Sequence, residues 1–568
     1  MTNLVAQNRS RNIFVSNGGN DDNTGFTDNV AKKTMTAAIQ AVIDGNPVLA
    51  DPITLSEVGG TRYEEGVIDF PDNGRYLLNG VSLTGSILMA ENANIFLYSI
   101  LSTGVGGETV ISSNGKSRAG IDVIGVICQG VGDIGHHITG ASSDNFCNIG
   151  QVSAWNDDCT LVKFDATGTP KQLDYKELTS GFELFGLQAN NTTFIHHQST
   201  LSETLVINCG SISDELGGSG HVGIYCEEGH LLTNVSDINL PNDDAIVVDA
   251  LGILNHRGAR CVGNITDNID GVLAFDVQTV EGNIFSYGMS SFKAETMAGN
   301  ISVLGDRTTL DIQALTGDII GDNDTDIVSN IQLQIGNVTY SNASLVTGNH
   351  YQGLIGNVVI NDGIHYFDIQ QHLGNFTVNG GAVRVDIDTI TSDFTTSAGS
   401  NVSGIILEVL GTITIEPNTF NGRIGDVVYG TWEDSGGEKQ QLAMTGNRDG
   451  NMPNSYSDTT QNLRFPINTT TDSITDANED YISCGYFQGN PNSRTVSFRV
   501  IDADDSTVYW EASNTETGSG QKNFNLDLVT DLVNPLPSNQ VVNLMVQSEK
   551  TGSGLSDASA VIVFTREP

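Results

Sequence analysis

The chain has 568 residues, more than one ordinary hydrophobic core can serve, so we expect either several domains or one extended repeat. Lys and Arg number 25 against 68 Asp and Glu, and the formal net charge of −43 argues against nucleic acid and anionic membranes as partners. Glycine is abundant at 64 residues and proline is scarce at 12, which favours tight turns between short strands.

The N-terminal segment, residues 1–59, is predicted to hold a short leading peptide and a capping helix. Residues 1–9 lack the apolar region of a secretory signal, and no run approaches 18 apolar residues, so we expect no such signal and no membrane span. Residues 34–44 have helical periodicity, which Gly45 would end. The apolar face of that predicted helix consists of Met35, Ala38, Ile39, Val42 and Ile43.

A Gly-Asn-apolar signal, once Gly-Asp, recurs through the middle of the chain at a nearly constant interval of about 18 residues. Glycine turns a corner because it tolerates positive φ, and stacked Asn side chains can hydrogen-bond from coil to coil. The alternation in Phe275-Asp276-Val277 puts the apolar pair on one face of a strand and the carboxylate on the other. The glycines of the signal are Gly263, Gly282, Gly299, Gly317, Gly336, Gly356 and Gly374.

This period is too short for a strand, a helix and a return crossover, but it fits one coil of a parallel β-helix. We therefore predict an all-β fold with a right-handed parallel β-helix over residues 60–418, since crossovers between parallel strands are almost always right-handed. The glycines should stack in one line along it. The segment 157–199 fits the repeat poorly and predicts a long loop or an inserted hairpin.

Seven cysteines, an odd number without a CxxC pair, argue against a zinc site or a disulfide framework. The spacing from Cys128 to Cys147 and the spacing from Cys209 to Cys226 both match the repeat. We therefore predict that these cysteines are small buried residues, stacked on one another in neighbouring coils.

Beyond residue 418 the Gly-Asn signal stops, and short strands between turn signals predict a β-sandwich at residues 419–568. A sandwich packed on the last coil would cover its open edge. Strands are expected at residues 495–500 and 506–511, as hairpin mates, and at residues 540–546 and 560–564.

Residues 12–16 form a predicted strand, residues 17–25 a Gly-Asn-Asp loop, and the helix of residues 34–44 follows. This order resembles the cap on the first coil of pectate-lyase-like parallel β-helix proteins, among them bacteriophage tailspikes and tail fibres. The resemblance implies a homotrimer that is joined to a virion tail or baseplate protein through its N-terminus. It also implies that the protein acts outside the host cell.

Two functions of different classes follow from this resemblance. The first is a structural virion protein, a tail fibre or tailspike that binds a host surface glycan or receptor. The second is a polysaccharide depolymerase, a glycoside hydrolase or lyase, on the same β-helix. We expect the first, without a cofactor. A cluster of Asp or Glu with Arg or Tyr at matching positions of adjacent coils would favour the second.

If the chain cleaves glycan, the predicted acid and base are Asp243 and Asp244, with His221 nearby. Asn242-Asp243-Asp244 resembles the paired-Asp strand of polygalacturonase-type hydrolases, and Gly220-His221-Val222-Gly223 resembles their Gly-His-Gly segment, although the two segments occur in the reverse order. The other acidic pairs are expected in solvated turns, and they are Glu64-Glu65, Asp157-Asp158 and Glu227-Glu228.

No metal site is predicted. The rings of His136 and His137, and of His196 and His197, would point to opposite faces of a strand, which argues against a shared ion. The oxygen-rich runs 322–326 and 502–506 lack the Gly and distant Glu of an EF-hand loop, and a hairpin turn explains the second.

The resemblance implies that the C-terminal domain, residues 419–568, holds three chains together. We also expect it to carry the receptor-binding surface, because binding residues concentrate on exposed loops. Its candidate sugar-stacking aromatics, for which core packing is the more common role, are Trp432, Tyr456, Tyr486, Tyr509 and Trp510.

Overall fold

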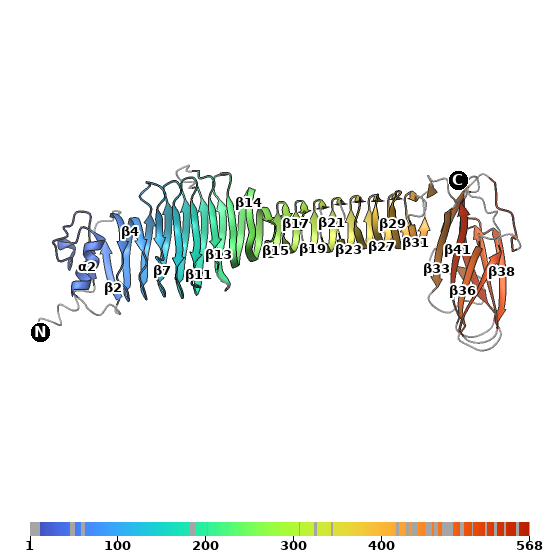
Figure 1. Cartoon of the computed structure of the whole chain (residues 1–568), viewed down its shortest axis with the longest axis horizontal. Coiled ribbons are helices and arrows are strands. Elements are labelled where there is room, and N and C mark those ends of the chain that lie inside the picture. Colours follow the sequence, from blue (N-terminus) through green and yellow to red (C-terminus); the bar gives the residue numbers. More distant parts are fainter. Residues whose placement is uncertain are drawn as a thin grey trace. The chain divides into compact units, whose positions relative to one another are not determined.

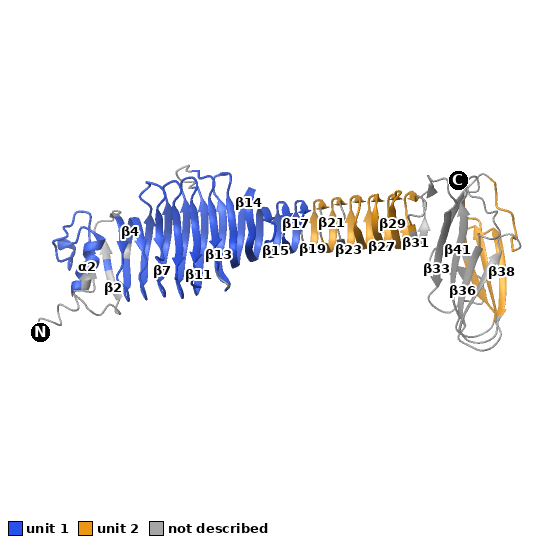
Figure 2. Ribbon diagram, in the orientation of Figure 1, with its two compact units in different colours: residues 1–312 blue, residues 313–568 orange. Residues whose placement is uncertain are grey.

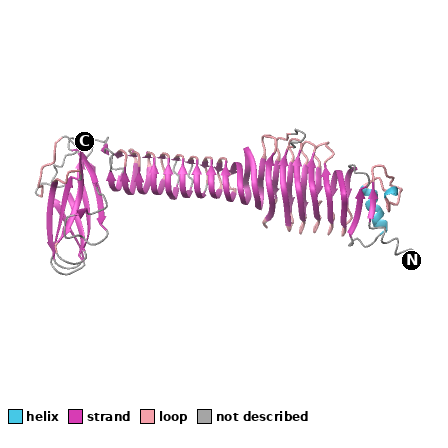
Figure 3. Ribbon diagram, turned by 180° about the vertical axis from the view of Figure 1, so that it is seen from behind, coloured by secondary structure: helices cyan, strands magenta, loops and turns pink. Residues whose placement is uncertain are grey.

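The structure, a computed structural model of the chain, divides into two compact units, residues 1–312 and 313–568 (Figure 1, Figure 2). Strands dominate both units, and the helices of the described residues lie in the N-terminal segment (Figure 3). In the described part of the chain, no helix is long and apolar enough to cross a bilayer. The structure describes residues 12–45, 52–57, 63–181, 188–200, 203–305, 307–322, 326–341, 345–415, 420–427, 432–433, 440–448, 457–458, 464–468, 481–488, 494–502, 504–516, 520–527, 531–538, 541–551 and 556–566.

A short helix packs on the first strands of unit 1. Strand β1 (Asn12–Val15) pairs in parallel with β2 (Pro52–Glu57), and helix α2 (Met35–Gly45) packs against β1 and β3 (Tyr63–Asp69). A 3-10 turn, η1 (Asp28–Val30), lies between β1 and α2 in the sequence.

The predicted capping helix is confirmed. The Oγ1 of Thr34 accepts a hydrogen bond from the N–H of Ala37 at 3.1 Å, which caps the N-terminus of α2. Met35, Ala38 and Ile39 are buried, as the predicted apolar face requires. The side chains of Val42 and Ile43 lie outside the described residues.

After one short coil, in which the side chains of Asn73 and Asn92 hydrogen-bond across 19 residues, the next strands of unit 1 form wide coils, and strands from successive coils pair in parallel. In one ladder Ile134 lies opposite Thr160, and Thr160 lies opposite Thr193. The side chains of Asp157 and Asn190, which are 33 residues apart, hydrogen-bond from one wide coil to the next. These strands are β4 (Arg75–Leu88), β5 (Asn94–Leu101), β6 (Thr109–Ser112), β7 (Gly120–Cys128), β8 (Ile134–Gly140), β9 (Phe146–Ala154), β10 (Thr160–Ala166), β11 (Gln172–Ser180), β12 (Thr193–Gln198) and β13 (Leu205–Asp214).

The wide coils correct two predictions made from the short period. The segment 157–199 is not an inserted loop, because it contains β10, β11 and β12, which pair in the regular parallel ladders. The cysteines do not stack at the predicted spacing, since Cys128 lies opposite Ala154. The six described cysteines are buried and free, and the side chain of Cys484 lies outside the described residues.

Unit 1 narrows after β14 (Figure 1). Ile253 lies opposite Val272, and Val272 lies opposite Met289. Asn283 and Asn300, which are 17 residues apart, hydrogen-bond between two of these coils. The strands here are β14 (Val222–Asp267), which continues through successive coils, β15 (Val272–Glu281), β16 (Ile284–Ser286), β17 (Met289–Ala298) and β18 (Ile301–Val303), and β19 (Arg307–Thr316) follows.

Unit 2 begins with narrow parallel coils of the same kind, which include the pairs β22–β24 and β24–β26. Their strands are β20 (Ile319–Gly321), β21 (Asp326–Ile335), β22 (Val338–Tyr340), β23 (Leu345–Ile355), β24 (Val358–Ile360), β25 (Ile364–Leu373), β26 (Phe376–Val378), β27 (Gly381–Ile390), β28 (Phe394–Thr396), β29 (Ser400–Val409), β30 (Ile413–Ile415), β31 (Phe420–Val427) and β32 (Trp432–Glu433).

The predicted parallel β-helix is therefore confirmed, and the structure is consistent with right-handed winding. Parallel pairing occurs from β1 in unit 1 to β32 in unit 2, which extends past both ends of the predicted range 60–418.

In most of the narrow coils one corner depends on a glycine, whereas the coil before β28 has Ser392 at that position. In unit 2, Gly336, Gly356 and Gly374 have φ between 148° and 149°, a region that other residues rarely adopt. A Cβ on Gly356 would lie 2.1 Å from the carbonyl oxygen of Gly336. In unit 1, a Cβ on Gly282 would lie at the same distance from the carbonyl oxygen of Gly263. Within each unit the glycines therefore stack in a line, as predicted.

The residue that follows each glycine, an asparagine or in one coil Asp318, joins one coil to the next. The Oδ1 of Asn337 accepts a hydrogen bond from the backbone N–H of Asn357 at 3.0 Å, and Asn357 does the same for Asn375 at 3.0 Å. In unit 1, Asn283 accepts from the N–H of Asn300 at 3.0 Å. The predicted ladder is confirmed, and its main donor is the backbone N–H.

The apolar residue after each asparagine points into the coil. This residue is the first inward-pointing side chain of the next strand. Such side chains from successive coils form the hydrophobic core inside the β-helix. These residues, each at most 1% exposed, are Ile265, Ile284, Ile301, Ile319, Val338, Val358 and Phe376.

The C-terminal strands of unit 2 pair in antiparallel sheets. The predicted hairpin of residues 495–500 and 506–511 is confirmed by the antiparallel pair β37–β38. One sheet has the order β33-β41-β36-β39, and another has the order β34-β40-β37-β38, with β35 paired to β40. The packing of the two as a sandwich stays a prediction. The strands are β33 (Gln440–Arg448), β34 (Ser457–Asp458), β35 (Arg464–Asn468), β36 (Tyr481–Gln488), β37 (Arg494–Asp502), β38 (Val508–Glu516), β39 (Gly520–Asp527), β40 (Val541–Lys550) and β41 (Ser556–Arg566).

The corner glycines give a direct test of this account. Gly356→Ala should lower the free energy of unfolding by about 2 kcal/mol or more, because the new Cβ meets a backbone oxygen and φ is unfavourable. Gly353→Ala is the matched control, since its Cβ would lie 3.2 Å from the end of the exposed Leu333 side chain. Denaturant unfolding followed by circular dichroism measures both, and equal stabilities would contradict the account.

Candidate ligand-binding site

An open pocket of about 760 Å³ lies in unit 1, where the coil narrows. Its lining comes from four successive coils, because the parallel register brings residues far apart in sequence to one face. We call it the step pocket, and its lining residues are Glu227, Asp249, Ala250, Leu251, Thr266, Asn268, Ile269, Phe285 and Tyr287.

The shortening of the coils accounts for the position of this pocket. The side chains of His196 and Glu227 meet across 31 residues of sequence, whereas those of Tyr225 and Asp249 meet across 24. Those of Asp249 and Asn268 meet across 19. The spacing between hydrogen-bonded side chains thus shortens across the residues that line the pocket.

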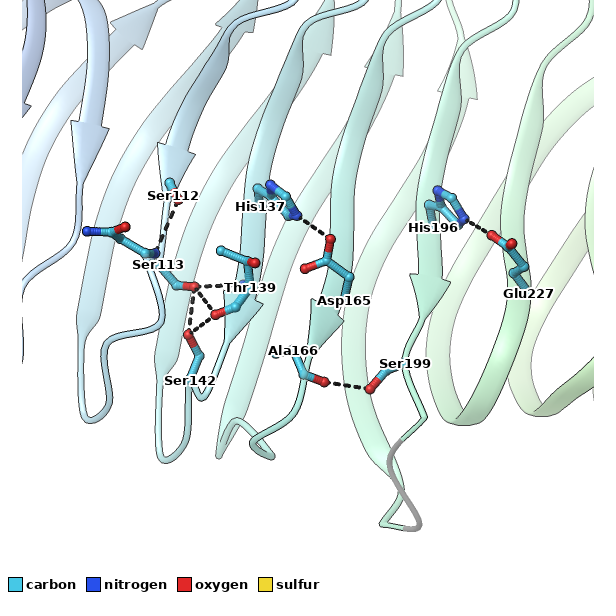
Figure 4. A network of polar contacts seen from close by, with 11 residues as sticks. Ser112, Ser113, His137, Thr139, Ser142, Asp165, Ala166, His196, Ser199 and Glu227 are labelled. Atoms are coloured by element: carbon cyan, nitrogen blue, oxygen red, sulfur yellow. Dashed lines mark hydrogen bonds and ion pairs between the residues drawn. The ribbon is translucent and has the colours of Figure 1, made fainter.

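Two carboxylates on adjacent coils lie in the step pocket, and each is fixed by hydrogen bonds. The Nε2 of His196 donates to Oε2 of Glu227 at 2.8 Å (Figure 4). The hydroxyl of Tyr225 donates to Oδ2 of Asp249, and the amide of Asn268 donates to its Oδ1 at 2.6 Å. Both carboxylates are therefore held in place before any ligand arrives.

The remaining lining is largely apolar and aromatic. Leu251 is 68% exposed and Ile269 is 65% exposed, so both form open edges of the pocket. Phe285 lies beside them on a narrow coil, opposite Thr266, and Tyr287 is half-buried. Apolar and aromatic surface with a few fixed polar groups is the usual composition of a small-molecule site.

A row of polar side chains leads along the wide coils to the pocket. His137, Lys163, His196 and Tyr225 occupy matching positions on β8, β10, β12 and β14. The Nε2 of His137 donates to Oδ2 of Asp165 at 2.8 Å, a contact that repeats the pairing of His196 with its acid (Figure 4). The rings of His196 and Tyr225 stack with centroids 4.9 Å apart.

The predicted catalytic residues are close in the backbone, but the structure does not present them as one site. The N–H of Asp244 donates to the carbonyl oxygen of His221 at 3.2 Å. The imidazole of His221 is buried, and its Nδ1 accepts the N–H of Thr192 at 3.2 Å. Its expected place beside a bound glycan is therefore corrected, because an enclosed ring cannot reach a ligand on the surface.

Asp243 and Asp244 have contacts of their own at the start of the narrow coils. The Oδ1 of Asp243 accepts the N–H of Gly220 at 2.8 Å. Burial raises the pKa of Asp244, and the adjacent carboxylate of Asp243 adds to the rise, whereas a hydrogen bond with Asn264 opposes it. Asp244 is thus hydrogen-bonded to Asn264, the first asparagine of the ladder. A catalytic role for the two aspartates stays a prediction.

The adjacent histidines divide between the two faces of their strands, as predicted. His137 and His196 point outward, whereas His136 and His197 are buried. Among the described residues, no group of three or more His, Cys, Asp or Glu is arranged to hold a metal ion. The run 322–326 lies partly outside the described residues.

The structure corrects two of the predicted receptor-binding aromatics. Tyr509 is 4% exposed and Trp510 is 1% exposed, and their rings pack together with centroids 6.1 Å apart. Both are core residues, so neither offers a face to a sugar. The side chains of Trp432 and Tyr486, and all of Tyr456, lie outside the described residues.

Sequence reasoning did not find the step pocket. Glu227 was noted only as part of an acidic pair expected in a turn, and Asp249 and Tyr287 lie in different coils. The register that joins them depends on a change of coil length, which the regular Gly-Asn signal does not reveal. The sequence offered one signal for the pocket: Tyr225 and Glu227 are alternate polar residues on one strand and therefore share its outer face.

Comparisons with known proteins add little. No family model matches the chain, and no curated protein matches it. One similar solved structure is the enzymatically active domain of tailspike protein 4 of bacteriophage CBA120, with a TM-score of 0.13 and 9% identity. The alignment covers 92% of this chain and 65% of the other, so the chain spans slightly less than two thirds of that structure. At this TM-score the similarity carries no argument about activity.

Acid is expected to destabilise the wide coils through His197. Burial lowers the pKa of His197 from 6.5 to about 4, and the neighbouring His196 adds to the shift. Below pH 6.5 the unfolded chain binds a proton that the folded chain does not. About 3 kcal/mol of stability that is present above pH 6.5 is therefore lost progressively as the pH falls from 6.5 to about 4.

His197→Phe keeps a ring against Phe164 and removes this titration. Its thermal midpoint should fall less steeply than that of the wild type between pH 6.5 and 4. The exposed His350→Gln should keep the wild-type slope. Equal slopes for the wild type and His197→Phe would show that the buried imidazole does not set the acid sensitivity.

Proposed function

We propose that this protein is a structural virion protein, a bacteriophage tail fibre or tailspike subunit whose β-helix binds a glycan on the host surface. The N-terminal segment, residues 1–59, would join it to a tail or baseplate protein, and the protein would act outside the host cell. The resemblance of residues 12–45 to the cap of phage β-helix proteins supports the virion role.

The step pocket is the observation that carries glycan binding. It combines half-buried Phe285 and Tyr287 with two fixed carboxylates, Glu227 and Asp249. Sugars offer an apolar ring face that stacks on aromatic side chains and a rim of hydroxyls that donate to carboxylates. The row of polar side chains extends this surface over the wide coils, which suits a chain of several sugars.

Glycan cleavage is the second candidate function. Acids and a tyrosine of adjacent coils lie together here, since Tyr225 hydrogen-bonds to Asp249, which lines the pocket with Glu227. Glycosidases use two carboxylates on either side of the scissile bond. In this candidate Glu227 and Asp249 take the roles that were predicted for Asp243 and Asp244.

The homotrimer proposed from the resemblance is supported by an uncharged strip on unit 2. Ile335, Ile355 and Leu373 lie opposite one another on β21, β23 and β25, and each is 39–45% exposed. Together with Leu333, Gly353 and Gln371 we call them the apolar strip, which carries no charged side chain.

A second copy of the chain is the partner that fits the apolar strip. Copies with a net charge of −43 repel each other except where their surfaces are neutral. Parallel copies have the same coil spacing, so their rows of aliphatic side chains would match coil for coil. Residues 419–568 would add further contacts in the trimer and carry a receptor-binding surface.

Glycan binding is tested on an array of bacterial surface polysaccharides. Tyr287→Ala should weaken binding of the recognised polysaccharide at least tenfold, about 1.4 kcal/mol, because it removes the stacking ring. Tyr98→Ala removes a 54% exposed aromatic outside the pocket and should bind as the wild type does. Reducing ends assayed in the same samples report cleavage. Binding to no polysaccharide, or equal loss in both variants, would reject the step pocket as the site.

Assembly is tested by adding charge to the apolar strip. The double variant Ile335→Glu/Ile355→Glu should lose the three-chain mass in light scattering, because carboxylates of several copies would meet there. Thr377→Glu/Thr395→Glu adds the same charge in register on β26 and β28 and should stay trimeric. The proposal would be overturned if the Ile335→Glu/Ile355→Glu variant kept the full trimer mass, or if the wild type were monomeric.

A further inference from the structure

We infer that the step pocket selects an uncharged or amine-bearing sugar with an apolar substituent and rejects acidic sugars. This inference rests on the proposed glycan binding and names the chemical class of its ligand. Three features of the pocket carry it: the sign of its charge, the hydrogen-bonding capacity left on its carboxylates, and the apolar edge beside them.

The first feature is the sign of the charge. The acidic side chains that line the pocket are Glu227 and Asp249, and none of the lining residues is Lys or Arg. The nearby His196 donates to Glu227, so this ring is already used by an acid of the pocket. A uronic acid, sulfate or phosphate group placed here would face two carboxylates without a cationic partner.

The second feature is the direction in which the pocket's hydrogen bonds run. Asp249 accepts from Tyr225 on one oxygen and from Asn268 on the other, and Glu227 accepts from His196 and Gln198 in the same way. A carboxylate oxygen has a further lone pair, so each acid can still accept but cannot donate. The ligand must supply the hydrogen, as a sugar hydroxyl or an ammonium does and an acid anion does not.

The third feature is the apolar edge. Leu251 and Ile269 are both mostly exposed and lie on neighbouring coils beside Phe285. An N-acetyl methyl group or a deoxy-sugar methyl group would cover this surface, whereas a fully hydroxylated or anionic substituent would leave it in water. The pocket is therefore suited to a group that donates hydrogen bonds on one side and is apolar on the other.

The experiment compares three hexasaccharides by isothermal titration calorimetry: N-acetylated chitohexaose, chitohexaose with free amines, and hexagalacturonate. The full-length wild-type protein should bind at least one of the first two at least tenfold more tightly than hexagalacturonate. Added salt should weaken the binding of the amine-bearing sugar and relieve the exclusion of the acidic one. The double variant Glu227→Gln/Asp249→Asn should lose at least tenfold of the discrimination against hexagalacturonate.

Asp276→Asn is the control, because it removes an exposed carboxylate from a neighbouring coil outside the pocket and should keep the wild-type preference. Equal or tighter binding of hexagalacturonate overturns the inference and leaves the proposed function standing. So does binding of none of the three sugars while the array shows binding to an acidic polysaccharide. Binding to no polysaccharide on the array overturns the proposed function itself.

Discussion

In most of the narrow coils, one corner depends on a close approach between two backbones. A glycine with φ near 150° lies so close to the carbonyl oxygen of the glycine one coil before it that a Cβ does not fit, as Gly336 and Gly356 show. The next residue, Asn337 in that coil, then accepts the N–H of Asn357. These two contacts set the corner, turn the following apolar residue inward and keep the coil short. The coil with Ser392 and Asp393 at this corner keeps the register and buries Phe394, so the repeat tolerates one departure from the glycine.

The site depends on the contrast between these corners and the wide coils before them. The wide coils have no such signal, and their hydrogen-bonded side chains meet across longer stretches of sequence at β8, β10 and β12. The first corner glycine of the signal, Gly263, follows Asp249 and precedes Asn268, so the step pocket forms where the two kinds of coil meet. Its acids are fixed from both kinds of coil, Glu227 by His196 and Asp249 by Asn268. A binding surface thus follows from a change in coil length.

The sequence was sufficient to predict the narrow coils, because their period is short and regular and its glycines are conformationally required. It was also sufficient for the capping helix and for the hairpin of β37 and β38. It failed for the wide coils, where loops of variable length hide the register, and so Cys128 was predicted to stack on the wrong residue. The pocket was missed for the same reason, since it joins residues of four coils. The burial of single side chains was also not predictable: nothing local distinguishes the enclosed ring of His221 from the partly exposed ring of His196.

The central claim is that the step between wide and narrow coils is the ligand-binding surface. The most direct measurement is a crystal structure of the protein soaked with an oligosaccharide prepared from the polysaccharide that it binds on the array. The account predicts electron density for a sugar ring against Tyr287 and Ile269, with a hydroxyl or amine in hydrogen-bonding distance of Asp249 or Glu227. Sugar density at full occupancy on other coils, together with an empty step pocket, would contradict the account.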